Sequence, residues 1–160
     1  MSVSIRTASA NDAELILRFI IELAIYEKAE HEVQTDAQGI RDSLFGPDSN
    51  SHALICEKDG VAIGYAVYFF NYSTWLGKHG LYLEDLYVSP EARGLGAGKK
   101  LLQHLAQIAV GQGCGRFEWS VLDWNTPAIE FYQSFGARPQ EEWTTYRLTG
   151  QALLDFAAAN

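Results

Sequence analysis

One stretch, residues 81–112, constrains the fold more than any other, because its pattern changes from strand to helix across a glycine-rich turn. Residues 81–88, Leu-Tyr-Leu-Glu-Asp-Leu-Tyr-Val, predict a strand, and the short loop 89–92 follows it. The turn itself is Arg-Gly-Leu-Gly-Ala-Gly at residues 93–98. Beyond it, apolar residues repeat with the spacing of one helix face until glycines supply a stop. We therefore predict a strand–turn–helix unit.

Such a unit has the chemistry of a phosphate cradle. Glycines lack Cβ atoms, so backbone N–H groups can approach an anion closely, and the first N–H groups of a helix have no internal partner. Arg93 adds a guanidinium group that can bind two phosphate oxygens at once. The G-x-G-x-G spacing differs from a Rossmann turn, and Gly98 precedes Lys99-Lys100 rather than the Lys-Ser/Thr of a Walker loop. The alternative interpretation is a glycine-rich connection with a solvated arginine.

Composition narrows the class of protein. A chain of 160 residues with 48% hydrophobic and 20% charged residues fits one domain, which we place at residues 1–160. No apolar run reaches membrane-spanning length and the N-terminus lacks a signal region, so we expect a cytoplasmic protein. A formal charge of −8 disfavours nucleic acid and anionic membranes as partners. It would raise the local concentration of a cationic substrate.

Cysteine and histidine usage gives no sign of a metal site or a disulfide framework. Cys56 and Cys114 are isolated, and the four histidines show no ligand spacing. Neither cysteine has a histidine at a motif spacing, which disfavours nucleophilic cysteine catalysis.

Shorter patterns place the other elements. Further strands are predicted at residues 5–8, 53–56, 61–70, 116–122 and 143–148, with residues 71–78 as a loop. Helices are predicted at residues 11–28, 35–46, 126–136 and 151–159. Capping boxes start the first two at Asn11–Glu14 and Thr35–Gln38, and Asp59-Gly60 predicts a hairpin. The order β-α-α-β-β-β-α-β-α-β-α predicts an α+β, or mixed α/β, fold with a twisted central mixed sheet flanked by helices.

Five segments together resemble the GNAT N-acetyltransferases over essentially the whole chain, and specifically the diamine (spermidine/spermine) acetyltransferase branch. They are Glu22-Leu23-Ala24-x-Tyr26-Glu27, Trp75-x-Gly77-Lys78, Tyr82-Leu83-Glu84-Asp85, Arg93-Gly94-x-Gly96-x-Gly98, and Trp124-Asn125 with Phe131-Tyr132 seven residues on. Polyamine enzymes carry Asp-Pro before the tryptophan, whereas Ser73-Thr74 stand here. At these positions the chain resembles more closely the sister group of enzymes, which acetylates thialysine, a lysine analogue.

The resemblance implies a GNAT-like fold, acetyl-CoA as donor, a small cationic amine as acceptor, no metal, and a homodimer. We expect the turn to hold the pyrophosphate and the backbone near Leu86 to pair with the pantetheine arm like an added strand, with an N–H as oxyanion donor. The predicted acetyl-CoA residues are Leu86, Tyr87, Val88, Arg93, Gly94, Leu95, Gly96, Ala97, Gly98, Lys99, Asn125, Thr126, Pro127 and Ala128.

The same resemblance gives the catalytic and acceptor residues. Tyr132 is the predicted acid for the leaving thiolate, since a phenol of pKa about 10 is protonated at neutral pH. Glu84 is the predicted acceptor-side catalytic carboxylate, and Tyr26, Glu27, Glu84 and Asp85 are the predicted acceptor-binding residues. In a regular strand Glu84 and Asp85 would point to opposite faces, so one would reach the acceptor and the other would be structural.

Several alternatives stay open at this point. Tyr132 is also consistent with a core position on an amphipathic helix, and the two carboxylates with attraction of a cation alone. The chain could be a CoA-binding regulatory module without catalysis. It could also acetylate a different amine, such as a protein N-terminus or a drug.

Overall fold

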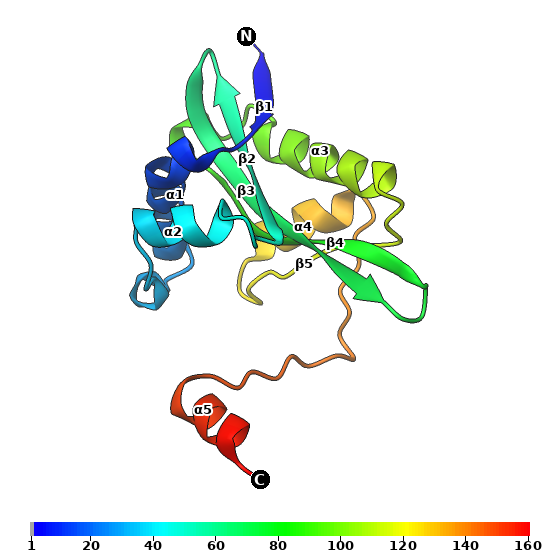
Figure 1. Cartoon of the computed structure of the whole chain (residues 1–160). Helices are drawn as coiled ribbons and strands as arrows, with labels where there is room; N and C mark the ends of the chain where they lie inside the picture. Colours follow the sequence, from blue (N-terminus) through cyan, green and yellow to red (C-terminus); the bar gives the residue numbers. More distant parts are fainter. Residues whose placement is uncertain (1) are drawn as a thin grey trace. The chain divides into compact units, whose positions relative to one another are not determined.

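The computed structural model describes residues 2–160, which divide after Leu122 into two compact units. The first unit contains a five-stranded sheet of order β1-β2-β3-β4-β5 (Figure 1). Its strands are β1 (Val3–Thr7), β2 (Ser51–Lys58), β3 (Val61–Ser73), β4 (Lys78–Val88) and β5 (Phe117–Trp119). The first four strands are antiparallel to their neighbours, and β5 is parallel to β4. The mixed sheet with its helices confirms the predicted α+β class.

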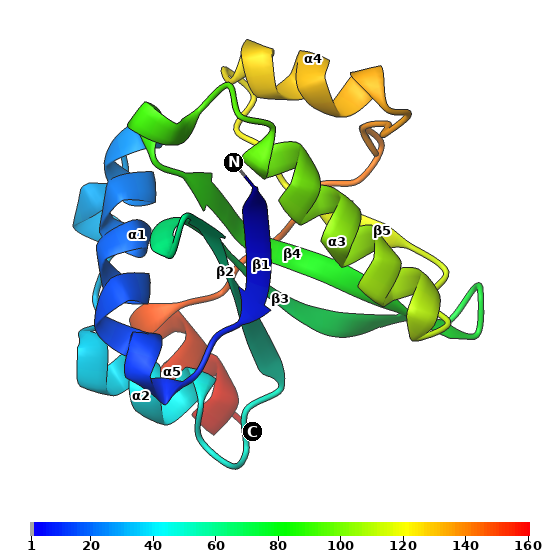
Figure 2. The same ribbon diagram turned by 90° about the horizontal axis from the view of Figure 1, so that it is seen from above.

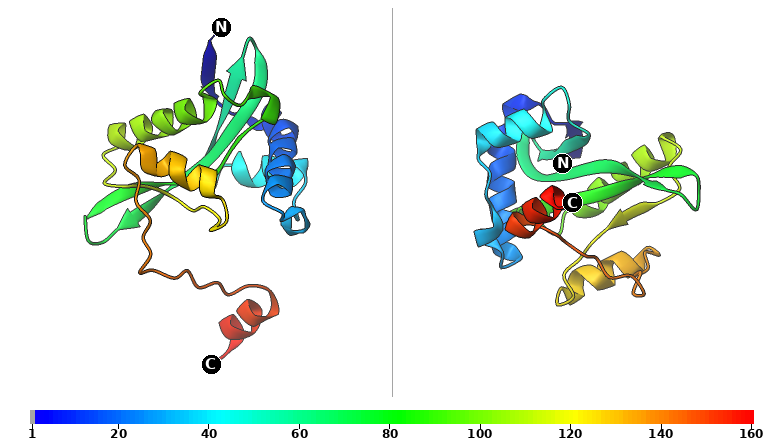
Figure 3. Two further views of the ribbon diagram at one scale, coloured as in Figure 1. Left: turned by 180° about the vertical axis from the view of Figure 1, so that it is seen from behind. Right: turned by 60° about the horizontal axis from the view of Figure 1, so that its bottom comes forward.

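Helices cover both faces of this sheet. Helices α1 (Ala13–Tyr26) and α2 (Ala37–Leu44) lie on one face, and α3 (Ala97–Gly111) lies on the other (Figures 2 and 3). Three short 3-10 turns complete the unit, at Ala10–Asp12 (η1), Glu30–Glu32 (η2) and Pro90–Ala92 (η3). The predicted strand–turn–helix unit is thus confirmed as β4, η3, the glycine turn and α3.

Aromatic packing joins α1 to the sheet. The ring of Phe19 stacks on Tyr65 with centroids 5.5 Å apart, and it contacts Tyr87 at 6.0 Å. Phe19 and Tyr65 are fully buried, and burial of a side chain of this size stabilises the fold by about 1.5–3 kcal/mol. On the other face, Leu101 and Leu105 of α3 are fully buried. The side chain of Tyr65 is therefore held between the sheet and α1.

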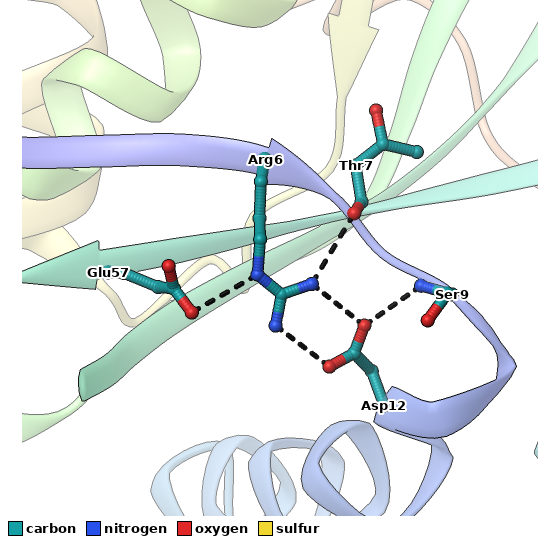
Figure 4. A network of polar contacts seen from close by, with 5 residues as sticks. All are labelled: Arg6, Thr7, Ser9, Asp12 and Glu57. Atoms are coloured by element: carbon teal, nitrogen blue, oxygen red, sulfur yellow. Dashed lines mark hydrogen bonds and ion pairs between the residues drawn. The ribbon is translucent and has the colours of Figure 1, made fainter. Parts of the chain in front are cut away.

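An arginine network fastens the start of α1 to the edge of the sheet (Figure 4). The Arg6 guanidinium donates to both carboxylate oxygens of Asp12, at 2.8 and 2.9 Å, and to Glu57 at 3.1 Å. The Ser9 N–H donates to the same Asp12 carboxylate at 2.8 Å. The guanidinium lowers the pKa of Asp12 below its ordinary value through these hydrogen bonds. β1, β2 and η1 are joined through this group.

The second unit holds α4 (Thr126–Ser134) and α5 (Gly150–Ala158), joined by an extended segment (Figure 1). The strand predicted at residues 143–148 is wrong, because these residues belong to no strand of the structure. Alternating β-formers are not sufficient, since a strand requires a hydrogen-bonded neighbour for its backbone groups. Here Trp143 and Tyr146 are exposed instead.

Several boundaries differ from the predicted ones. The N-caps of α1 and α2 are Asp12 and Asp36, each one residue after the first residue of its predicted capping box. The N-cap of α4 is Asn125, one residue before the predicted start of that helix. The Asp36 carboxylate accepts from the Gly39 N–H at 2.8 Å, a role that the sequence pattern gave to Thr35. β3 and β4 take up half of the predicted loop 71–78, which leaves residues 74–77 as the turn, and β5 is shorter than predicted.

Candidate active site

A cavity of about 560 Å³ lies between α1, the segment that follows it and β4. Its lining residues are Ile20, Leu23, Ala24, Glu27, Ala29, Glu32, Val33, Gln34, Thr35, Glu84 and Asp85. Three of the four predicted acceptor residues therefore meet in one place. The fourth, Tyr26, does not line the cavity, and its ring lies 5.4 Å from the guanidinium carbon of Arg93.

Acidic side chains dominate the charge of this cavity. Glu27 comes from the end of α1, Glu32 from η2, and Glu84 and Asp85 from β4. Lysine and arginine are absent from its lining within residues 2–160. The walls between the carboxylates are mainly apolar. The cavity therefore combines apolar surface with negative charge, which suits an alkyl chain that carries ammonium groups.

A β-bulge explains why Glu84 and Asp85 both reach the cavity. Asp85 pairs with Val67 of β3, but the next pair is Leu83 with Tyr68, so Glu84 is an extra residue on β4. A bulge interrupts the alternation of side chains and re-aims one of them. The expectation that the two carboxylates would serve separate faces is therefore wrong for this strand.

Asp85 has a buried hydrogen-bond partner that sequence reasoning missed. The Tyr65 hydroxyl donates to Asp85 Oδ2 at 2.7 Å. Burial raises the pKa of the Asp85 carboxyl, and the hydrogen bond from Tyr65 acts in the opposite direction. Burial and the negative charge of Asp85 also raise the pKa of Glu27 above its ordinary value. Tyr65 carries no motif, and its place on β3 is the only signal that could have indicated a contact with β4.

The glycine turn after β4 has an open surface. Gly94 and Gly96 have φ angles of 88° and 77°, a left-handed conformation that favours glycine. A Cβ placed on either residue would meet no atom within 4 Å, so another molecule can approach the backbone. The first internal helical bond runs from the Lys100 N–H to the Gly96 carbonyl oxygen at 3.0 Å. The preceding N–H groups, from Ala97, Gly98 and Lys99, form the helix N-terminus.

Arg93 has a structural role that the sequence did not predict. Its Nε donates to the Val88 carbonyl oxygen at 3.1 Å. Its guanidinium also lies near the rings of Tyr26 and Tyr87, at 5.4 and 5.7 Å from their centroids. These contacts connect the turn to β4 and to the end of α1.

The end of β4 is paired on one side. Residues 85–88 pair with β3, from Val67↔Asp85 to Gly64↔Val88, whereas the pairing with β5 ends at Leu83↔Trp119. Within residues 2–160 the β5 side of the strand after Leu83 has no ladder partner in the sheet. This places Leu86, Tyr87 and Val88 at an edge where an extended molecule can add hydrogen bonds.

The remaining predicted residues belong to the second unit. Asn125 caps α4, and Thr126, Pro127 and Ala128 form its first turn. Tyr132 is half-buried in an aromatic cluster, with its ring centroid 5.8 Å from that of Phe131 and 6.4 Å from that of Phe135.

Three further observations concern the predicted substrate marker Ser73, metal binding and membrane-spanning helices. Ser73 is outside the cavity, and its hydroxyl accepts from the Leu76 N–H at 3.2 Å, so it closes the β3–β4 turn. Residues 2–160 contain no group of three or more histidine, cysteine, aspartate or glutamate residues placed to hold a metal ion. Over the same residues, none of the helices has the length and apolar character needed to cross a membrane.

Comparison with known proteins places these features in a family. Residues 18–137 match the Acetyltransferase (GNAT) family. A thialysine N-epsilon-acetyltransferase from Sus scrofa is 40% identical over 98% of both chains, and that from Mus musculus is 37% identical over the same shares. A human spermidine/spermine N(1)-acetyltransferase-like protein 1 is 36% identical over 96% of this chain and 23% of its own. The structure of an integron cassette protein from V. cholerae superposes with a TM-score of 0.83, at 29% identity over 99% of both chains.

Proposed function

Because this chain belongs to the GNAT family of acetyltransferases, we propose that it moves an acetyl group from acetyl-CoA to a primary amine of a small cationic acceptor. The acceptor is a lysine-like amine such as thialysine, or a polyamine. GNAT acetyltransferases use acetyl-CoA as the donor. The observation that carries the choice of acceptor is the cavity in which Glu27, Glu32, Glu84 and Asp85 meet.

The acidic cavity has to bind a cation and also release its proton. A nearby carboxylate stabilises the ammonium form of an amine, yet only the neutral amine can attack a thioester. In this proposal Glu84 takes the proton, directly or through water, and the nitrogen lone pair then forms the bond to the acetyl carbon. The C–S bond breaks, and Tyr132 donates its proton to the departing thiolate. The nitrogen then loses its second proton, which restores the Tyr132 phenol, and the proton on Glu84 leaves to solvent. Activity then rises with pH as the amine loses its proton.

The donor is held by the glycine turn and the end of β4. The N–H groups of residues 94–99 bind the pyrophosphate, and an N–H near Leu86 stabilises the oxyanion. The open space above Gly94 and Gly96 and the one-sided pairing of β4 support this assignment. Asn125 and the first turn of α4 complete the proposed donor residues. These residues are proposed because the family match, over residues 18–137, includes them although they lie beyond Leu122.

Two observations favour different acceptors. The relatives from Sus scrofa and Mus musculus are named for thialysine, and Ser73-Thr74 stand where the polyamine enzymes that the chain resembles carry Asp-Pro. Thialysine, however, carries an α-carboxylate, and the cavity presents acidic residues without a basic one among the residues that line it. This charge favours a polyamine, which has ammonium groups only. The second candidate acceptor is therefore a polyamine, in agreement with the human relative named for spermidine and spermine.

The proposal extends to the organisation of the protein. Residues 1–160 form a single acetyltransferase domain, which acts as a homodimer in the cytoplasm. The family match across Leu122 supports the single domain, and the resemblance to the diamine branch supports the dimer. Light scattering on the purified protein measures the mass of the assembly, and a monomer at micromolar concentration would contradict the dimer.

Thiol release from acetyl-CoA tests the proposed function. Release should depend on an added cationic amine, and mass spectrometry should find the acetyl group on that amine. Glu27→Gln should weaken use of the amine, because it removes one cavity charge. Glu14→Gln is the matched control, since it removes the same charge from an exposed residue in the first turn of α1. A CoA-binding module without catalysis would release no thiol with any amine.

A further inference from the structure

We propose that Tyr65 is a positioning residue for the acceptor, because its phenol fixes the Asp85 carboxylate in the orientation and charge state that bind an ammonium group. This inference rests on the proposed function, since it requires that the acidic cavity hold a cationic amine. It adds to the predicted site a residue on β3, the strand next to the one that carries the cavity carboxylates.

The geometry of Tyr65 leaves its hydroxyl little freedom. Tyr65 pairs with Tyr87 across the β3–β4 ladder, and Asp85 lies two residues before Tyr87. Residues in this diagonal relation share one face of a sheet. The Tyr65 side chain has an exposed fraction of 0%, and its ring stacks on Phe19 with an interplanar angle of 14°. The stacking on Phe19 and the complete burial of the side chain therefore hold the hydroxyl in its 2.7 Å hydrogen bond to Asp85 Oδ2.

Asp85 needs such a donor because its surroundings oppose its charge. It lines the same cavity as Glu27 from the end of α1, Glu32 from η2 and Glu84 from β4. Burial favours the neutral carboxyl, whereas a hydrogen bond from Tyr65 favours the carboxylate. The same burial raises the pKa of Tyr65, so its phenol remains a donor at neutral pH. With Oδ2 bound to Tyr65, Oδ1 is left to accept from an ammonium group of the acceptor.

A purely structural tyrosine would not have this relation to the cavity. The buried ring alone explains the stacking on Phe19, and a phenylalanine would pack there in the same way. The hydroxyl, in contrast, is directed to a residue that lines the cavity. Removing only the hydroxyl of Tyr65 therefore separates its packing role in the core from its positioning role at Asp85.

Tyr65→Phe is the variant that tests this role. Its KM for the cationic amine should rise about tenfold, the effect of losing one hydrogen bond to a charged group. At high pH, where Asp85 is ionised in both proteins, its kcat should stay close to that of the wild type. The acid limb of kcat/KM should move to higher pH, because Asp85 then protonates more readily. KM for acetyl-CoA should not change.

Tyr68→Phe is the matched control, since it removes the hydroxyl of another buried tyrosine on β3 that does not line the cavity. It should leave the acceptor KM and the pH profile unchanged. Asp85→Asn should raise the acceptor KM by itself, and adding Tyr65→Phe to it should have little further effect, as expected when one residue acts through the other.

Calorimetry of spermidine and thialysine binding to the free protein separates this inference from the proposed function. Weaker binding to Tyr65→Phe, with the melting temperature within a few degrees of the wild type, supports the role of Tyr65. Equal binding overturns it, and so does an equal loss in kcat and in both KM values without a pH shift. Absence of turnover with every amine refutes the proposed function, while the binding comparison still decides the role of Tyr65. Absence of amine binding by the wild type refutes both.

Discussion

The Nε of Arg93 donates a hydrogen bond of 3.1 Å to the carbonyl oxygen of Val88, so the first residue of the glycine turn is fastened to the last residue of β4. The guanidinium also lies near the rings of Tyr26 and Tyr87. Arg93 thus links the strand proposed to bind pantetheine, the turn proposed to bind pyrophosphate, and the end of the helix beside the acceptor cavity. A residue predicted only as a phosphate ligand holds three parts of the site together.

Arg93→Lys tests this link, because it keeps the charge and removes the planar group. Lysine cannot reproduce both the Nε hydrogen bond and the contacts with the two rings. We expect KM for acetyl-CoA to rise by about tenfold, the scale of one lost hydrogen bond with a charged donor. Steady-state kinetics at saturating amine measures this, with Arg41→Lys on α2 as the control. An unchanged KM would show that only the charge of Arg93 matters.

Gly96→Asp tests the pyrophosphate site. The substitution places a negative charge at the N-terminus of α3, where the phosphates are proposed to bind, and it strains a residue whose φ is 77°. Gly96→Ala is the matched control, since it adds the strain, about 1–2 kcal/mol, without the charge. Calorimetry should find that the aspartate variant loses CoA affinity far more than the alanine variant, with both proteins folded. Equal affinities of the two variants would remove the turn from the donor site.

Tyr132→Phe tests the acid. It keeps the ring within the cluster with Phe131 and Phe135 and removes the proton. Turnover should fall by roughly 10²-fold, the usual scale for a lost general acid, while CoA binding changes little. Tyr146→Phe is the control from the same unit, because Tyr146 is 94% exposed. Full activity of Tyr132→Phe across the pH range would remove Tyr132 from the mechanism.

Asp12→Asn tests the arginine network, which lies in the fold and not in the site. The pKa of Asp12 is lowered in the folded state, so its contribution to stability is present above the unfolded pKa of about 3.9 and is lost as the pH falls below it. At pH 7 the variant should lose about 2 kcal/mol of unfolding free energy, the scale of hydrogen bonds with a charged group. Urea unfolding at pH 7 and near pH 3 measures both values. A difference between the two proteins that stays the same at both pH values would contradict this assignment.

Turn residues and the spacing of apolar residues correctly predicted those elements whose formation depends mainly on nearby residues. The Asp59-Gly60 pair forms the hairpin between β2 and β3 with positive φ at both residues, 52° and 77°, as that turn requires. The periodicity after the glycine turn gave α3, whose apolar residues are buried. The N-cap of α2 lies at Asp36 instead of Thr35 because threonine and aspartate both cap helices well and stand next to each other here. The segment 143–148 failed because strand formation depends on a partner that local sequence does not specify.

The acceptor cavity shows more clearly which features of the site could not be predicted from the sequence. The sequence identified Glu27, Glu84 and Asp85 through a family resemblance, and the structure brings all of them to one cavity. It did not indicate the bulge at Glu84, because a bulge is a property of the register between two strands. It did not indicate Tyr65, because the Tyr65–Asp85 contact is diagonal across that same register. Both features arise from pairing between β3 and β4.

The ranking of amines by kcat/KM, in the wild type and in Glu84→Gln, decides whether the acidic cavity binds and deprotonates a cationic acceptor. The amines are spermidine, putrescine, lysine, thialysine and a neutral aryl amine. We predict that a cationic amine ranks first and the neutral amine last, with thialysine ahead of spermidine, in agreement with the relatives named for thialysine. Glu84→Gln should raise KM for the cation and lower kcat together, because both binding and proton removal depend on the carboxylate. A neutral amine in first place, or a Glu84→Gln variant with unchanged ranking and rates, would refute this role of the acidic cavity.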